Sequence, residues 1–280
     1  MIEVSALKNS FKVAVGRLAE LLLPHLARDI DENRNTRRAA RLKQAIIYAR
    51  TRRATSRRDA DALEKSLASF WKEQSGDKFH AEYIDLRFDT FKKHHAGLIE
   101  AFAAQIEAGA GPFKRIVEIG CGDGKVLDYC AKRLPQIGAL VGLDINASAL
   151  ARASRDFAGN ERLTFVEADG LDWLAAHPRA GTALLTYGGV LEYFAQARVE
   201  TLFQVLAAQG PAAIVIAEPL APEHDLEAEP NSLIFGREHS FSHNYPDQFR
   251  KAGFRLAYHE EMEQGWTRWI LAVGIAGRPG

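Results

Sequence analysis

The chain has 280 residues, of which 47% are hydrophobic and 26% charged, and its 36 basic residues balance its 36 acidic residues. This composition is typical of a globular protein rather than a disordered one, and the length allows one large domain or one domain with a sizeable extension. No stretch approaches the ~20 apolar residues of a membrane-spanning helix, and the first residues lack the pattern of a secretory signal. Since Cys121 and Cys130 are the only cysteines, no disulfide framework is expected and we predict a cytoplasmic protein.

The first 112 residues differ from the rest in charge and periodicity. They contain 20 basic and 15 acidic residues, a net charge of +5, whereas residues 113–280 have a net charge of −5. Within 33–58 there are ten basic residues and no acidic one. Apolar residues recur every three or four positions up to a glycine- and proline-containing break at 109–112, which predicts helices. We therefore predict an all-helical N-terminal domain at 1–112 and a second domain at 113–280.

In the second domain, short apolar segments alternate with segments of helical period, which is typical of a buried parallel sheet built from βαβ units. A short turn around Gly265 separates the last two apolar segments, which favours an antiparallel hairpin at the sheet edge. The predicted fold is therefore a Rossmann-like, doubly wound, mostly parallel sheet of seven strands with an antiparallel C-terminal hairpin. The predicted strands are 116–119, 139–143, 163–167, 183–187, 212–217, 255–261 and 268–275. Residues 219–245 form a long connection of the kind that covers a binding site.

A glycine-rich turn follows the first predicted strand. Its three glycines, Gly120, Gly122 and Gly124, allow a sharp turn and a close approach of the backbone to a ligand. The turn lies where open α/β sheets bind ligands, at the start of a helix whose first amides are free to donate. Lys125 breaks the dinucleotide-binding spacing. The segment that begins at Glu118 reads Glu-x-Gly-x-Gly-x-Gly instead, and it resembles motif I of the class I S-adenosylmethionine-dependent methyltransferases.

Two acidic residues extend this resemblance. Asp144 ends the second strand, 20 residues after Gly124, and Asp169 follows the third. The resemblance implies S-adenosylmethionine as the cofactor, with Asp144 accepting from both ribose hydroxyls and Asp169 from the adenine amino group; either could instead cap a helix. Cys121 is expected to be a small residue of the turn and not a nucleophile. The remaining implied cofactor-binding residues are Gly120, Cys121, Gly122, Gly124, Ile145, Gly170 and Tyr187, together with Glu118, which is expected to help hold the turn and the cofactor's methionine end as a buried organiser rather than as a direct ligand. Tyr83 and Arg87 either reach the cofactor's carboxylate or have packing and solvated roles, and the second interpretation is favoured.

Methyl transfer requires the acceptor, the methyl group and the sulfonium to be aligned, and a hydroxyl acceptor also needs a base. Tyr187 and Glu192 follow the fourth strand and are candidate catalytic residues. His243, in the 219–245 connection, is the preferred base of an O-methyltransferase; the alternative is that it packs against or caps the following helix. The positions at which catechol-type members bind Mg²⁺ carry Thr186-Tyr187-Gly188 and Glu218-Pro219, and no Cys/His cluster has zinc spacing, so no metal is predicted.

The sequence therefore predicts an S-adenosylmethionine-dependent methyltransferase that acts on oxygen or nitrogen of a small molecule, for example a sugar or a natural-product intermediate. The alternatives are an RNA or protein methyltransferase that uses the basic 33–58 segment, or a catalytically silent binding subunit. The basic segment either meets phosphates or forms a charged helical face paired with acids of the second domain, and the second interpretation is favoured. The N-terminal helices are expected to cover the active site or to form an oligomer contact.

Overall fold

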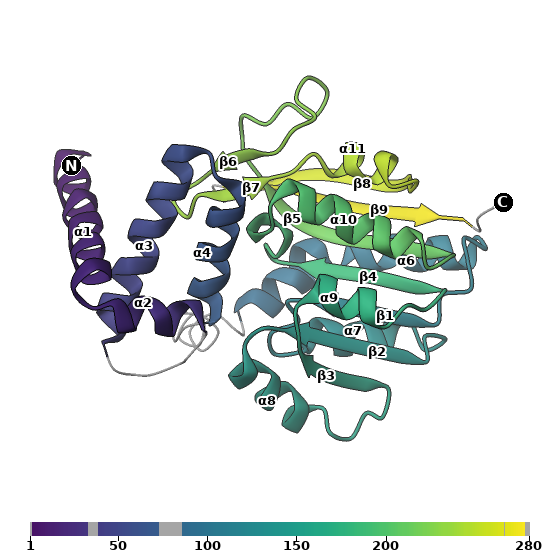
Figure 1. The fold of residues 1–280 in the computed structure, drawn as a ribbon. Coiled ribbons are helices and arrows are strands. Elements are labelled where there is room, and N and C mark those ends of the chain that lie inside the picture. The colour runs from purple at the N-terminus through teal and green to yellow at the C-terminus, as the bar shows by residue number, and fades with distance from the viewer. Residues whose placement is uncertain (1, 33–38, 73–85, 266, 278–280) are drawn as a thin grey trace. The chain divides into compact units, whose positions relative to one another are not determined.

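The computed structural model describes residues 2–32, 39–72, 86–265 and 267–277, and the chain divides into two compact units. Unit 1 comprises residues 1–79 and 236–240, and unit 2 comprises residues 80–235 and 241–280 (Figure 1). The N-terminal part of unit 1 therefore ends at residue 79, whereas the charge and periodicity of the sequence predict a domain boundary at 112. The reason is that the helices of residues 86–107 bury their apolar side chains, Phe91 and Phe102 among them, in the core of the sheet. Within the described residues no helix is both long and apolar enough to span a bilayer.

The described residues up to 72 form four helices, which confirms the predicted helical character of the N-terminal segment. A proline starts the second of them, where its missing N–H costs no hydrogen bond. Ala19, Leu26 and Ile46 belong to the small core of the unit. The first and third helices pack closely at Gly16, where a Cβ would lie 2.0 Å from the Ala45 carbonyl oxygen. The helices are α1 (Ile2–Leu22), α2 (Pro24–Asp31), α3 (Ala40–Arg57) and α4 (Ala60–Lys72).

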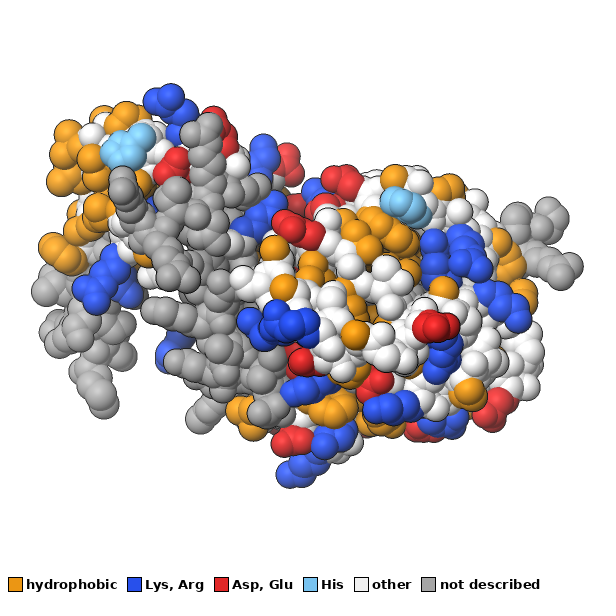
Figure 2. Space-filling model, turned by 90° about the horizontal axis from the view of Figure 1, so that it is seen from below, with side chains coloured by type: hydrophobic (Ala, Val, Ile, Leu, Met, Phe, Trp, Pro, Cys, Tyr) orange, Lys and Arg blue, Asp and Glu red, His pale blue; other side chains and the backbone are white. Residues whose placement is uncertain are grey.

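One face of α1 carries large apolar side chains that remain at the surface. Phe11, Leu18, Leu21 and Leu22 are 58–78% exposed, and Figure 2 shows hydrophobic side chains at the surface of the helical unit. Single exposed apolar residues are normal, but an aligned group of them is typical of an interaction surface. An oligomer contact through the N-terminal helices stays a prediction.

The sheet of unit 2 confirms the predicted architecture. Its strand order is β3-β2-β1-β4-β5-β9-β8. The first five strands are parallel, and β9 is antiparallel to both β5 and β8. Every residue of the central strands β1 and β5 is buried, which explains why both are mainly apolar and makes Arg115, Glu118 and Glu218 exceptional there. The strands are β1 (Arg115–Ile119), β2 (Ala139–Asp144), β3 (Leu163–Glu167), β4 (Thr182–Tyr187), β5 (Ala212–Leu220), β8 (Arg255–Gln264) and β9 (Thr267–Ala276).

Helices cover both faces of this sheet, and the alternation of side chains along β4 shows how. Leu185 and Tyr187 join the core formed with η1, α6 and α7, whereas Leu184 joins the opposite core formed with α9, α10 and α11. The helical elements of unit 2 are η1 (Phe91–His95, a π-helix), α6 (Gly97–Glu107), α7 (Lys125–Arg133), α8 (Ala147–Asp156), α9 (Gly170–Ala176), η2 (Leu191–Tyr193, a 3₁₀ turn), α10 (Gln196–Ala207) and α11 (Tyr245–Lys251).

The long connection after β5 contains a two-stranded hairpin, β6 (Leu233–Phe235) and β7 (Ser240–Ser242). Ser242 Oγ accepts from the Ala221 amide at 2.9 Å and contacts His224 Nδ1 at 2.8 Å. The segment expected to be an irregular covering loop is therefore ordered by its own buried hydrogen bonds.

Candidate active site

A cleft opens at the carboxyl end of β1 and encloses about 400 Å³ of empty space, part of it open to solvent. Three segments form its walls: the glycine-rich turn, the helical residues 86–90 and the end of β4. This is the edge of the sheet where doubly wound folds bind ligands. The lining residues are Arg87, Phe88, Glu118, Gly120, Cys121, Gly122, Asp123, Val126 and Tyr187.

The glycines of the turn are required by its backbone conformation. Gly120, Gly122 and Gly124 have φ angles of 71°, 52° and 75°, which side-chain-bearing residues rarely adopt. A Cβ at Gly120 would lie 2.5 Å from Val190 Cγ2, and one at Gly124 would lie 2.6 Å from the Phe165 ring. The turn therefore combines a left-handed backbone with close packing, and both depend on glycine.

Asp144 joins the turn to the end of β2. Its Oδ2 accepts from the Gly122 amide and its Oδ1 from the Asn146 amide, each at 2.9 Å. The side chain is buried, yet each carboxylate oxygen can accept a second hydrogen bond. Asn146, and not Asp144, caps α8, since its Oδ1 accepts from the Ala149 amide. Ile145 lies between them and is half-buried.

Asp169 caps α9, as the alternative interpretation anticipated. Its Oδ1 accepts from the Leu171 and Asp172 amides at 3.0 and 3.2 Å and pairs with Arg198 Nη2 at 2.5 Å. Gly170 begins the helix directly behind it, and a Cβ there would lie 2.4 Å from Ile119 Cδ1. These three contacts all involve Oδ1, so capping is compatible with a second role for Asp169.

Glu118 places a buried carboxyl group in the wall of the cleft. Burial, together with the neighbouring Asp123, raises its pKa well above the usual value, while Arg87 acts in the opposite direction. Among the residues that the structure describes, none forms a hydrogen bond with Glu118 Oε2. A buried polar atom without a partner is costly, so this oxygen is suited to a donor supplied by a ligand.

Arg87 links the helical segment 86–90 to the loop after β4. Its Nη2 donates to the Gly188 carbonyl oxygen at 3.2 Å, and its own carbonyl accepts from the Tyr187 hydroxyl at 3.1 Å. Burial raises the pKa of Tyr187 to about 12. The phenol is thus a protonated donor that fixes the wall of the cleft, and it is not poised to act as a base.

Cys121 and Glu192, two further predicted residues, lie in different environments. Burial, followed by the charge of Asp144, raises the pKa of Cys121 well above its usual value, so its thiol stays protonated. The half-buried Glu192 side chain lies over Gly189, where a Cβ would be 2.2 Å from Glu192 Oε1. Tyr83 lies outside the described residues.

His243 is fully buried and does not line the cleft. Its Nδ1 contacts Ser232 Oγ at 2.6 Å and its Nε2 contacts the Leu191 carbonyl oxygen at 2.9 Å. Burial lowers the pKa of His243 to about 4. Both ring nitrogens are thus engaged in holding the loop after β4, which favours the structural alternative for this residue over the role of a general base.

Glu218 anchors the same loop, a role that the sequence pattern does not indicate. It is fully buried at the carboxyl end of β5, and its Oε2 accepts from the Val190 and Leu191 amides at 2.9 and 3.1 Å. Burial raises its pKa to about 7 in spite of these donors. An acidic residue directly after an apolar strand was the available signal. Across the described ranges, no group of three His, Cys, Asp or Glu side chains is arranged to hold a metal ion.

Comparison with known proteins finds similarity to methyltransferases, in agreement with the glycine-rich turn and the acidic residues of the cleft. Residues 116–210 match the family model of a methyltransferase domain. The chain is 31% identical over 111 residues to a trans-aconitate 2-methyltransferase of Afipia carboxidovorans, and 37% identical over 75 residues to a ribosomal RNA small subunit methyltransferase A of Geobacter sulfurreducens. These alignments cover 39% and 27% of this chain and only 38% and 25% of the relatives, so the chain spans less than half of the length of either.

A solved structure shares the fold. It is the magnesium protoporphyrin IX methyltransferase from Synechocystis PCC 6803 with bound S-adenosylmethionine, which has a TM-score of 0.53 at 14% identity and covers 76% of this chain and 97% of its own. Residues 116–210 thus match a methyltransferase domain, and the chain shares the fold of a methyltransferase that was solved with S-adenosylmethionine bound, in agreement with the resemblance of motif I.

Proposed function

We propose that this methyltransferase domain binds S-adenosylmethionine in the cleft at the end of β1 and transfers its methyl group to oxygen or nitrogen of a small molecule. The observation that carries the proposal is the combination of the glycine-rich turn with Asp144, which is hydrogen-bonded to Gly122, and with Glu118 Oε2, which has no hydrogen-bond partner among the described residues. The cofactor presents hydroxyl, amine and ammonium donors, and the site presents carboxylate acceptors.

Each part of the cofactor has a candidate partner. Asp144 accepts from the ribose hydroxyls, Asp169 from the adenine amino group and Glu118 from the ammonium of the methionine moiety. Arg87, which contributes its guanidinium to the cleft, attracts the carboxylate. When bound, the cofactor supplies an electrophilic methyl group on a sulfonium. The protein contributes alignment and the exclusion of water.

The acceptor is expected beyond the end of β4, where Tyr187 and Glu192 lie. Of the three catalytic candidates, Glu192 is the one whose side chain is only half-buried, and a carboxyl group is a common general base. We therefore assign the acid–base role to Glu192, and a positioning role to His243 and Tyr187, whose side chains fix the loop after β4 and the segment 86–90.

Calorimetric titration with S-adenosylmethionine and with its demethylated product tests this proposal. We expect both to bind the wild type, and binding to be lost in Asp144→Ala, because the ribose hydroxyls and the Gly122 amide lose their acceptor. Asp156→Ala, an exposed acid at the end of α8, is the matched control and should bind normally. A wild-type protein that binds neither compound would overturn the assignment.

A further inference from the structure

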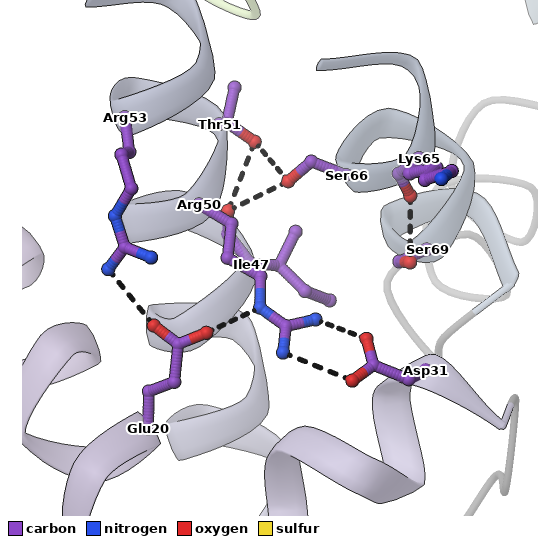
Figure 3. A network of polar contacts seen from close by, with 9 residues as sticks. All are labelled: Glu20, Asp31, Ile47, Arg50, Thr51, Arg53, Lys65, Ser66 and Ser69. Atoms are coloured by element: carbon purple, nitrogen blue, oxygen red, sulfur yellow. Dashed lines mark hydrogen bonds and ion pairs between the residues drawn. The ribbon is translucent and has the colours of Figure 1, made fainter. Parts of the chain in front are cut away.

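Neighbouring arginines on α3 have different electrostatic environments. Arg50 Nε lies 2.8 Å from Glu20 Oε1 and its Nη1 lies 2.6 Å from Asp31, while Arg53 Nη2 lies 3.1 Å from Glu20 Oε2 (Figure 3). These acids belong to unit 1 itself, so two arginines of the basic segment are neutralised from within the helical unit. Arg52 lies between the two paired arginines and is not part of this network.

Arg52 belongs instead to a cluster that contains no acid. Its guanidinium carbon lies 5.9 Å from the centroid of the Tyr48 ring, one helical turn back on α3, and Lys12 Nζ on α1 lies 5.7 Å from the same centroid. Arg52 Nη1 also contacts Nε2 of His239 at 2.5 Å. Residues 236–240 belong to the same compact unit as the helices. Two cations therefore lie against one aromatic ring, and an imidazole contacts one of these cations.

The positive charge of this cluster has no counter-charge in the described part of the protein. None of the carboxylates described there forms an ion pair with Lys12 or Arg52. Burial, followed by the charge of Arg52, lowers the pKa of His239, so the neutral ring accepts a hydrogen bond from the guanidinium. A guanidinium has five N–H donors and an ammonium has three, so most N–H donors of Arg52 and Lys12 remain for another acceptor.

We propose that Lys12, Tyr48, Arg52 and His239 form a binding site for the phosphate group of a ligand. A phosphate supplies several acceptor oxygens and the missing negative charge, and it matches both the fork of an arginine and the point charge of a lysine. The site is compact, because Lys12 and Arg52 share the Tyr48 ring and His239 contacts Arg52, and both Arg52 and His239 are half-buried. That arrangement favours one phosphate or diphosphate of a small molecule over a long nucleic-acid track, which would need an extended row of cations.

The test is calorimetric titration of the full chain with pyrophosphate and with inorganic phosphate. We expect saturable binding at one site per chain, weakened at least tenfold in Lys12→Gln and in Arg52→Gln. Lys12 is exposed at the surface of α1, so its variant keeps the proposal testable even if Arg52→Gln folds poorly. Arg17→Gln on α1 and Arg57→Gln on α3 are the matched controls, both at exposed positions, and should change affinity less than twofold.

Titration with a single-stranded oligonucleotide of ten nucleotides, at 50 and 200 mM salt, distinguishes a phosphorylated small molecule from a nucleic acid as the ligand. Displacement of the oligonucleotide by equimolar pyrophosphate supports a small-molecule ligand. Alternatively, oligonucleotide binding can depend on Arg52, fall steeply with salt and resist competition by pyrophosphate. That result would show that the ligand is a nucleic acid and not a small molecule. Absence of saturable binding by every probe, or equal weakening in the control variants, would overturn the proposed site.

Discussion

Replacing Glu218 with glutamine should remove a pH dependence of stability that the wild-type fold carries. Burial raises the pKa of this carboxyl from 4.5 to about 7 in the folded protein. Between these values the folded state binds one proton more than the unfolded state, so the free energy of unfolding falls as pH rises, by ~1.4 kcal/mol per pH unit. The full span corresponds to ~3 kcal/mol, and above the folded pKa the penalty of a buried carboxylate is constant. Glutamine keeps an acceptor for the Val190 and Leu191 amides but cannot ionise.

Urea unfolding of the wild type and of Glu218→Gln at pH 5, 6, 7 and 8, followed by circular dichroism, measures this effect. The stability of the variant relative to the wild type should rise by ~2–3 kcal/mol from pH 5 to pH 8, with most of the change below pH 7. Glu227→Gln, at an exposed position, is the control and should show no such trend. A flat difference curve for Glu218→Gln would refute the reasoning, because it would mean that the buried carboxyl titrates as it does in the unfolded chain.

Three further outcomes are expected. Gly120→Ala should lower the free energy of unfolding by ~2–4 kcal/mol, since its φ of 71° and its contact with Val190 both oppose a Cβ, and calorimetry should show cofactor binding lost; unchanged stability would argue against the observed turn. His243→Ala should cost ~2–4 kcal/mol in urea unfolding through two lost buried hydrogen bonds, while cofactor affinity changes little; an unaffected unfolding curve would contradict its positioning role. Leu18→Gln should shift any dimer seen by light scattering toward monomer, because it removes a 58%-exposed apolar side chain from α1; a dimer that persists would exclude this face.

The local features of this protein were predictable from its sequence. Each of the three glycines of the turn has a positive φ, which favours glycine. The residue type at each of these positions therefore indicates the backbone conformation directly. The alternation of short apolar segments predicted all seven strands, and the short turn around Gly265 predicted the antiparallel pairing of β8 with β9. Such patterns can be recognised because they depend on residues close together in the chain.

The burial and pairing of individual side chains were decided by the tertiary structure. His243 lies in a polar segment that suggests a base, yet it is buried and bonded to Leu191, 52 positions earlier. Arg50 is paired with Glu20, 30 positions earlier, and the basic run itself does not reveal this acid. Likewise, the helical period of residues 86–107 predicts helices but does not reveal which core they join. A pKa or an ion pair depends on what surrounds a group in space, and those neighbours come together only when distant parts of the chain fold.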